Sequence, residues 1–407
     1  MIIKSIELND FRNYHDLKIE VSPSINIFYG SNAQGKTNIV EAINVCSCLS
    51  SHRTSKDSDM IPFGMDNYSI AMNCLDKDGY ETKLSVDYSL QNTPNRKIAQ
   101  DNIKLSRISE FLGICNTVIF APEDLSLIKG APSVRRRFFN LLISKSIPSY
   151  TKLLHTFNHI LMQRNKTLKD IKFNNSADVN MLLDYWDYPL AEVSSEIIIV
   201  RYRFALLLSE YAHKHHLIIS SNKEDLQIRY DTISGVSEAL EAFVKDEDIL
   251  SRFISGTAST AILEGIKANV HDIVLSRLTK NRQNDIEHGI TMSGIHKDEL
   301  DITLNGLSMK NFSSQGQQRS ASLSIKLAEL EILRQITSTS PILLLDDVFS
   351  ELDINRRVAL LSGMVDAQIF ITCTDRSYIE KEIKQLLKTN EEPKFFKIEA
   401  GKVYPDC

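Results

Sequence analysis

The chain of 407 residues is 43% apolar, which is enough to bury a large core and to form two or three structural units. Its 47 basic and 52 acidic residues give a formal charge of −5, so a uniformly basic, histone-like protein is excluded and any nucleic-acid binding must use local patches. The six cysteines show no C-x-x-C spacing, which argues against a zinc site or a redox pair and favours reduced thiols in a cytoplasmic compartment.

The first thirty residues predict three β-strands, at 2–8, 17–21 and 25–29, joined by turn-rich segments. The opening residues lack the charged-then-apolar layout of a signal peptide. The most apolar tracts are too short, or too interrupted by charge, to cross a bilayer, so no membrane partner is expected.

A phosphate-binding loop is predicted between the third strand and a helix at 38–49. It matches the template G-x-x-x-x-G-K-[ST] at every fixed position, and its backbone N–H groups and the helix start would cradle a triphosphate. Lys36 would reach the β- and γ-phosphates, and the Thr37 hydroxyl would bind Mg²⁺. This phosphate loop comprises Gly30, Ser31, Asn32, Ala33, Gln34, Gly35, Lys36 and Thr37. An ordinary turn between strand and helix is the alternative.

The next part of the chain predicts a hairpin at 68–75 and 81–88, and a further strand at 117–120. Long helical periodicity with few turn signals then predicts a mostly helical insertion from about 121 to 285. Basic side chains are grouped on its helices. Each group alone fits a solvated helix face, but grouped Arg and Lys are also what a nucleic-acid backbone requires. The candidate DNA contacts are Arg135, Arg136, Arg137, Arg164 and Lys166.

From residue 286 the strand pattern returns in alternation with helices, which is typical of an α/β protein. Asn305-Gly306 is a strong two-residue hairpin signal. The predicted elements are strands at 289–292, 300–304, 341–345 and 368–373, helices at 314–337 and 354–365, and a final helix and strand.

Two acids end the apolar strand at 341–345, in the form of a Walker B strand. Asp346 would hold the Mg²⁺ shell, together with Thr37, at the carboxyl edge of the sheet. Asp347 would polarise an attacking water as the hydrolytic base, so Lys36, Asp346 and Asp347 are the candidate catalytic residues. The alternative is a buried strand followed by a capping pair of acids.

A polar, glycine-containing segment opens the helix at 314–337. It resembles the signature motif of ABC-type ATPases, in which a serine and backbone amides at a helix N-terminus meet the γ-phosphate held by a second molecule. Its candidate nucleotide-binding residues are Ser313, Ser314, Gln315, Gly316 and Gln317. Residues 350–353 follow the acids as the D-loop of those ATPases does.

Together these motifs resemble the RecF family of DNA repair ATPases, in the SMC/ABC-type group, over essentially the whole length. The resemblance is also carried by Asn9-Asp10-Phe11-Arg12-Asn13-Tyr14, Ser51-His52-Arg53-Thr54, Phe120-Ala121-Pro122-Glu123-Asp124-Leu125, Arg135-Arg136-Arg137-Phe138, Gln163-Arg164-Asn165 and Leu345-Asp346-Asp347-Val348-Phe349-Ser350-Glu351-Leu352-Asp353. One segment departs: residues 294–299 read Gly-Ile-His-Lys-Asp-Glu where the family usually reads Gly-Pro-His-Arg-Asp. Lysine there binds a phosphate as a point charge and not with two parallel bonds.

The resemblance implies an α/β fold with an ABC-type ATPase head made from both chain ends, residues 1–120 and 286–407, and a helical arm inserted at 121–285. It implies that Arg12 also binds the nucleotide, and that two heads close on two ATP molecules with Mg²⁺. The Walker B pair has Asp347 where many ABC ATPases have Glu, a shorter reach that is consistent with slow hydrolysis.

The family's activity is a weak, DNA-stimulated ATPase in the cytoplasm. The resemblance implies that an ATP-dependent homodimer binds duplex DNA next to single-strand gaps, and also single strands, and that slow hydrolysis releases it. It further implies that the protein works with RecR and RecO in loading RecA, in repair and replication-fork maintenance and in support of the SOS response.

The main alternative is the ATPase subunit of a membrane transporter, which shares the three motifs. Loop and signature stand about 280 residues apart here, whereas transporter heads keep them within one domain length. A small-molecule kinase has no use for the signature segment. His213, His215 and His216 could suggest a metal, but no acid or cysteine stands at ligand spacing, and a polar helix end is expected.

Overall fold

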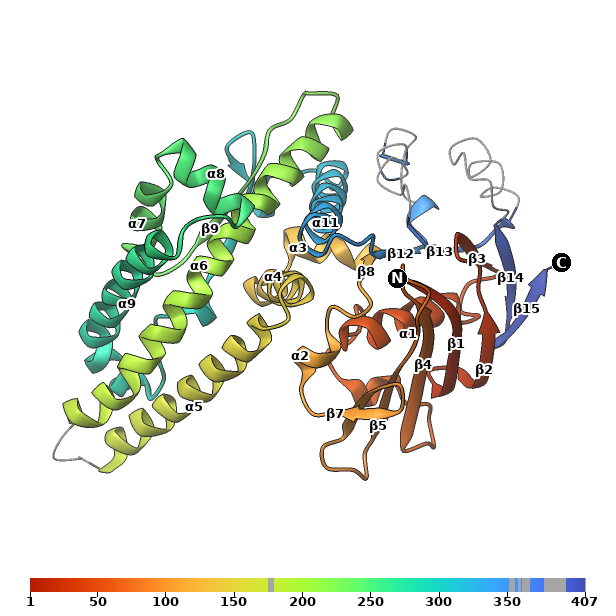
Figure 1. The fold of residues 1–407 in the computed structure, drawn as a ribbon, viewed down its shortest axis with the longest axis horizontal. Helices are drawn as coiled ribbons and strands as arrows, with labels where there is room; N and C mark the ends of the chain where they lie inside the picture. Colours follow the sequence, from red (N-terminus) through yellow and green to blue (C-terminus); the bar gives the residue numbers. More distant parts are fainter. Residues whose placement is uncertain (175–178, 351–355, 358–359, 361–366, 377–392, 407) are drawn as a thin grey trace.

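The computed structural model describes residues 1–174, 179–350, 356–357, 360, 367–376 and 393–406, and shows a β-rich head joined to a long helical arm (Figure 1). The predicted helix at 354–365, the predicted D-loop and the last predicted helix lie largely or wholly outside the described residues.

The centre of the head is a six-stranded sheet to which both ends of the chain contribute, in the order β15-β14-β3-β13-β12-β8. All neighbours in this sheet run parallel except β15, which is antiparallel to β14. Every residue of β8, β12 and β13 is buried, as expected for parallel strands covered on both faces. The strands are β3 (Ile25–Tyr29), β8 (Thr117–Phe120), β12 (Ile342–Asp346), β13 (Ile369–Cys373), β14 (Lys394–Glu399) and β15 (Lys402–Asp406).

A second, antiparallel sheet of the head has the order β2-β1-β4-β5-β6-β7. Helix α1 (Lys36–Cys48) follows the phosphate loop and contacts strands of both sheets, with 11 of its 13 residues buried. Cys46 and Cys48 are buried there, as the core residues that their place on the helix predicts. The strands are β1 (Ile2–Phe11), β2 (Tyr14–Glu20), β4 (Asn67–Leu75), β5 (Glu81–Ser89), β6 (Arg96–Gln100) and β7 (Ile103–Leu105).

The arm is built mainly from long helices. The longest of the described helices, α6, packs along α11, which we call the signature helix because it begins with the signature segment (Figure 1). None of the helices in the described residues is both long and apolar enough to cross a membrane. The long helices are α4 (Pro132–Ser146), α5 (Tyr150–Asn174), α6 (Val179–Ile219), α7 (Val236–Phe243), α8 (Glu247–Ser255), α9 (Thr260–His288) and α11 (Gln315–Thr337). The short ones are η1 (Asp57–Met60), α2 (Ile108–Phe111), η2 (Pro122–Leu125), α3 (Ser126–Lys129), η3 (Ile295–Lys297), α10 (Met309–Phe312) and η4 (Val348–Ser350).

A three-stranded sheet, β11-β10-β9, connects the arm with the chain that follows it. Strand β9 (Leu226–Asp231) lies inside the predicted helical insertion and pairs with β10 (Glu299–Leu304) across the predicted boundary at 285–286. The predicted hairpin is present: β10 turns into β11 (Leu307–Ser308) through Asn305 and Gly306, which have φ of 51° and 79°.

The predicted strand at 289–292 is wrong. Gly289 caps α9 in the left-handed conformation with φ 67°, and the backbone amides that follow bond to side chains of the arm. The Thr291 N–H donates to Asn165 Oδ1 at 2.8 Å, and the Met292 N–H donates to Asp285 Oδ1 at 2.9 Å. The backbone N–H groups of Thr291 and Met292 thus have side-chain partners, whereas in a β-strand they would bond to a neighbouring strand.

Candidate nucleotide site

The phosphate loop packs closely against two segments, β14 near the end of the chain and the turn that follows β1. Gly30 has φ +150°, and a Cβ there would lie 2.4 Å from the Ile398 carbonyl oxygen of β14. Gly35 has φ +115°, and a Cβ there would lie 2.6 Å from Asn13 Nδ2 and 2.8 Å from the Tyr14 hydroxyl oxygen. Only glycine meets both the backbone angle and the space at these positions.

The tip of the loop is open and its base is tied to the C-terminal hairpin. Ser31, Asn32 and Ala33 are exposed, and Ala33 has a left-handed φ of 63°. Gln34 accepts the Ala400 N–H on its side chain at 2.6 Å. Backbone N–H groups of the tip are therefore available to a ligand while the base stays fixed.

Lys36 lies folded across the loop. Its Nζ donates to the carbonyl oxygens of Gly30 at 2.7 Å and Ser31 at 2.8 Å. Burial lowers the pKa of Lys36, an effect opposed by the nearby charges of Asp347 and Asp346. Phosphate oxygens would replace the two carbonyls as partners and would satisfy the partly desolvated ammonium better.

Asp346 ends β12 at the same sheet edge as the phosphate loop and is only 3% exposed. Its Oδ1 accepts hydrogen bonds from Thr37 Oγ1 at 2.9 Å and from Thr372 Oγ1, at the end of β13, at 2.7 Å. Burial alone would raise the pKa of Asp346, but His52, Thr372 and Thr37 outweigh it and hold the pKa below its usual range. The carboxylate therefore stays ionised at neutral pH.

Asp347 has the opposite environment. Its side chain is exposed, and its backbone has a left-handed φ of 52° while its N–H donates to Thr372 Oγ1 at 2.9 Å. A non-glycine residue in this conformation stores strain of a kind that is common at functional sites. The two adjacent acids therefore differ: Asp346 is buried and bonded to Thr37, whereas Asp347 is exposed.

The Thr37 hydroxyl and the Asp346 carboxylate are hard oxygen ligands of the kind Mg²⁺ prefers, and they already lie within hydrogen-bond distance of each other. His52 supports the fit. Its side chain is 8% exposed, its Nε2 lies 3.8 Å from Asp346 Oδ2, and neither ring nitrogen has a hydrogen-bond partner among the described residues. A metal-bound water would give this buried imidazole the partner it lacks.

Arg12 is held beside the start of α1. Its Nε and Nη2 donate to the two carboxylate oxygens of Glu41 at 2.9 and 2.6 Å, and its Nη1 donates to the Asp59 carbonyl at 2.7 Å. Glu41 is fully buried on α1, so the guanidinium is fixed relative to the phosphate loop. Its predicted contact with nucleotide stays a prediction.

The signature segment opens α11 on an exposed helix start. Ser314 caps the helix, because its side-chain hydroxyl accepts a hydrogen bond from the Gln317 N–H at 3.2 Å. In turn, the side-chain oxygen of Gln317 accepts a hydrogen bond from the Ser314 N–H at 2.9 Å. Gln317 also donates to Glu224 of the arm at 2.9 Å, and Arg356 donates to the Gly316 carbonyl at 2.9 Å. In the described part of the chain, no hydrogen bond joins residues 313–317 to the phosphate loop.

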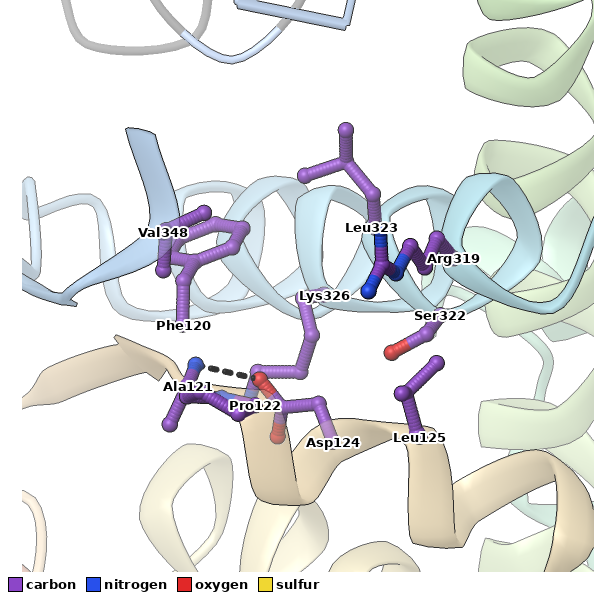
Figure 2. Close-up of a pocket in the computed structure, with 10 residues that line it drawn as sticks. All are labelled: Phe120, Ala121, Pro122, Asp124, Leu125, Arg319, Ser322, Leu323, Lys326 and Val348. Carbon is purple, nitrogen blue, oxygen red and sulfur yellow. Dashed lines mark hydrogen bonds between the residues drawn. The ribbon is translucent and has the colours of Figure 1, made fainter. Parts of the chain in front are cut away.

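A small pocket of about 50 Å³ lies where the end of β8 meets α11 (Figure 2). Lys326 of α11 points toward Ala121 and Asp124, and Asp124 Oδ2 accepts the Ala121 N–H at 2.9 Å. Burial raises the pKa of Asp124 to about 6, although the charge of Lys326 opposes the rise. The buried Lys326 of α11 therefore lies near the half-buried Asp124 of η2, just after β8 (Figure 2).

Two of the candidate DNA contacts are corrected, because the structure buries them in ion pairs. Arg135 donates from Nε and Nη2 to both oxygens of Glu299 at 2.6 Å. Arg164 is 0% exposed and donates to Asp187 at 2.6 Å and to Asp285 at 2.7 Å. Their charge is already neutralised inside the protein, so neither side chain is presented to DNA.

The other three DNA candidates lie at the surface: Arg137 and Lys166 are exposed and Arg136 is half-buried. The described residues hold no group of three or more metal-ligating side chains, and His216 is buried against Glu224 and Ser324 instead. Sequence reasoning missed His52 and Thr372 as neighbours of Asp346. The motif around His52 was visible, but nothing in its spacing pointed to β12.

A model of the AAA domain matches residues 5–399, a span that takes in the head and the arm alike. With the phosphate loop and the Walker B strand at one sheet edge, this match defines the chain as a P-loop protein of the ATPase-head class. The prediction of an ABC-type head with a long helical arm is confirmed.

The chain belongs to the RecF family, since it is 37% identical to the DNA replication and repair protein RecF of Ruminiclostridium cellulolyticum over 99% of both chains. It is 38% identical to RecF of Acetivibrio thermocellus over 99% of this chain and 100% of that one. A solved structure of the recombination mediator protein RecF-ATP in the RecFOR pathway has a TM-score of 0.84 at 34% identity, with 100% of this chain and 98% of that chain covered. The corresponding RecF-ATPrS structure has a TM-score of 0.81 at 33% identity, with 99% and 97% covered.

Proposed function

We propose that the protein is an ATP- and Mg²⁺-dependent DNA-binding protein of repair and replication, whose two copies close on nucleotide and open after hydrolysis. The ATP complexes of its structural relatives support nucleotide binding, and the names of its curated relatives support the role in DNA repair. The transporter alternative is set aside, because the relatives are DNA replication and repair proteins.

Each residue of the site has a role in this proposal. Lys36 leaves the loop carbonyls for phosphate oxygens, and Arg12, fixed by Glu41, lies ready to contact the nucleotide. Thr37 and Asp346 hold Mg²⁺, which when bound neutralises charge on the β- and γ-phosphates. Asp347 orients the attacking water and accepts its proton.

The single observation that carries the proposal of a dimer is the separation of the two halves of the site. The phosphate loop and Asp346 lie at one sheet edge, while residues 313–317, of which Ser314 and Gln315 are exposed, bond to Glu224 and Arg356 and, within the described chain, not to the loop. A helix start with free amides and a serine is an anion site. A second copy would bring its own residues 313–317 to the nucleotide held by the first, and ATP would join the two heads.

The finer roles follow from the family. We propose that the closed dimer binds duplex DNA beside single-strand gaps, that hydrolysis is slow and stimulated by DNA, and that the protein acts with RecR and RecO in loading RecA in the cytoplasm, in support of the SOS response. Arg136, Arg137 and Lys166 remain candidates for the DNA contacts, because all three keep surface exposure.

Binding of a labelled gapped duplex tests this function. It is measured without nucleotide, with ATP and with a non-hydrolysable analogue, while light scattering follows the mass of the complex. We expect the analogue to give a stable dimer that holds DNA, and ATP to give one that dissociates with time. The proposal would be contradicted if the affinity for DNA were the same with and without nucleotide and the protein stayed monomeric in every case.

A further inference from the structure

A groove lies where the arm meets the head, between α4 and the segment that follows α1, and its lining combines two arginines with small polar side chains and the leucines Leu112 and Leu141. It has a volume of about 430 Å³, and α4 contributes Ser133, Arg136, Arg137 and Asn140 to its lining, while Ser50 faces them from the head. None of the residues that line it, in the described part of the chain, is acidic. We call it the α4 groove.

A third cation, Lys297 of the segment that departs from the family pattern, lies near Arg136 but is not one of the residues that line the groove. Arg136 Nη1 donates to the Asp298 carbonyl at 2.8 Å, which fixes α4 against η3 and the exposed Lys297 beside Asp298. Burial lowers the pKa of the neighbouring His296, and the positive charges of Lys297 and Arg136 lower it further. Two stretches far apart in sequence therefore concentrate positive charge on one side of α4.

These three cations differ from the other basic groups around them. Arg135 is neutralised by Glu299, and Arg201 by Asp298, in contacts of 2.6 and 2.5 Å. The ion pairs of the described residues include none of Arg136, Arg137 and Lys297. Arg137 instead donates to the neutral oxygens of Ser50 at 2.7 Å and Ser51 at 3.1 Å. An anion would be a stronger partner for each of them.

We propose that the α4 groove binds the phosphate backbone of DNA, with Arg136 and Arg137 of its lining and the exposed Lys297 beside it as the contacts. The inference rests on the proposed function and assigns its DNA contacts to a particular place. A row of cations with serine and asparagine hydroxyl and amide groups between them suits phosphodiester oxygens, whatever the base sequence. Lys297 contributes as a point charge and Arg137 with its planar fork.

The groove is bonded directly to the nucleotide site. Ser51, which accepts from Arg137 through its carbonyl, donates its hydroxyl to Glu41 at 2.5 Å, and Glu41 holds Arg12. His52 follows in the chain and lies beside Asp346. A phosphate that draws Arg137 away from Ser50 and Ser51 therefore acts on the segment that supports both Arg12 and Asp346.

The test is the salt dependence of DNA binding by the full-length protein with a non-hydrolysable ATP analogue. Arg137→Ala and Lys297→Ala should each weaken binding, and each should reduce the slope of log affinity against log salt by about one. The drop in affinity between about 50 and 200 mM salt should then be roughly three- to four-fold smaller per removed contact. Arg137→Lys should restore the slope, since it keeps the charge.

Lys402→Ala is the matched control, because Lys402 is exposed on β15, at the opposite edge of the central sheet from β8. It should bind as the unaltered protein does. If Arg137→Ala and Lys297→Ala also bind with unchanged affinity and slope, the groove is not the DNA site, although the proposed function stands. If the unaltered protein binds no DNA in any nucleotide state, the proposed function itself fails.

Discussion

Asp346 and Asp347 are adjacent in sequence, yet the end of one strand gives them different chemistry. Asp346 continues the buried face of β12 and receives two hydroxyl hydrogen bonds on one oxygen, which favours its ionised form. Asp347, in contrast, is exposed and has a left-handed backbone. A ligand of a metal must stay ionised and fixed, whereas a proton acceptor must reach a mobile water.

Replacing Asp347 by Asn should separate binding from hydrolysis. The amide keeps the size of the side chain but accepts a proton poorly, so we expect ATP hydrolysis to fall about 10²-fold or more while ATP-bound dimers accumulate. Phosphate release and light scattering measure the two effects. Unchanged turnover would remove Asp347 from the role of base.

His52 is predicted to position Asp346 and the water shell of the metal, not to touch the nucleotide. His52→Ala should raise the Mg²⁺ concentration needed for tight binding of a fluorescent ATP analogue by about ten-fold, in the range found for groups that orient metal ligands. His52→Gln, which keeps a donor near Asp346, should recover much of the loss. Equal Mg²⁺ requirements in all three proteins would show that His52 only fills space.

At the scale of elements, the sequence predicts those features whose residues are close together in the chain. The phosphate loop and the run ending in Asp346 have fixed spacing, because each is one strand and the turn after it. Arg164 and Arg135 were misjudged because their partners, Asp187, Asp285 and Glu299, lie far away in the chain. No pattern within a helix says which of its charges another helix will neutralise.

The contact between α11 and η2, the short helix that follows β8, should depend on pH. Asp124 has a folded-state pKa raised to about 6, so it favours folding when protonated, and that contribution is lost as pH rises from about 4 through about 6. Asp124→Asn resembles the protonated form and still accepts the Ala121 N–H. Its melting temperature should exceed that of the unaltered protein by a margin that grows from pH 5 to 7.

The control for this experiment is Glu123→Gln, because Glu123 is exposed and adjacent. Its difference from the unaltered protein should stay constant over the same pH range. If Asp124→Asn also shows a constant difference, the carboxyl group at position 124 is ionised in the folded protein throughout and its burial does not control the contact.

In the proposed dimer, one half of each nucleotide site is the phosphate loop of one copy, and the other half is the start of α11 of the second copy. The predicted segments 1–120, 121–285 and 286–407 stay predictions. Pairing of β9 with β10 shows why a boundary is hard to read from sequence: a single strand inside a helical region ties the arm to the chain after it. The sequence pattern marks each strand but not its partner.

Lys36→Ala should abolish association as well as nucleotide binding, because the dimer is proposed to close on the nucleotide itself. We expect no binding of a fluorescent ATP analogue and a monomer at every nucleotide concentration, measured by light scattering. Circular dichroism should show an intact fold, since Lys36 Nζ, within the described residues, donates its hydrogen bonds to two carbonyls of the loop itself. A Lys36→Ala dimer that forms with ATP would disprove closure on the nucleotide.

The strand order of the central sheet also determines how late in translation the nucleotide site can form. Ile27 of β3 pairs with Ile371 on one side and Phe395 on the other, so the strand that presents the phosphate loop finds both neighbours near the end of the chain. A ribosome adds roughly 5–20 residues per second, so β3 waits on the order of 20 seconds or more with both edges open. A nascent chain that ends before β13 therefore lacks both strands that pair with β3. Such a chain could form helices of the arm but not the nucleotide site, and its unpaired strand edges would make it a target of chaperones or proteases.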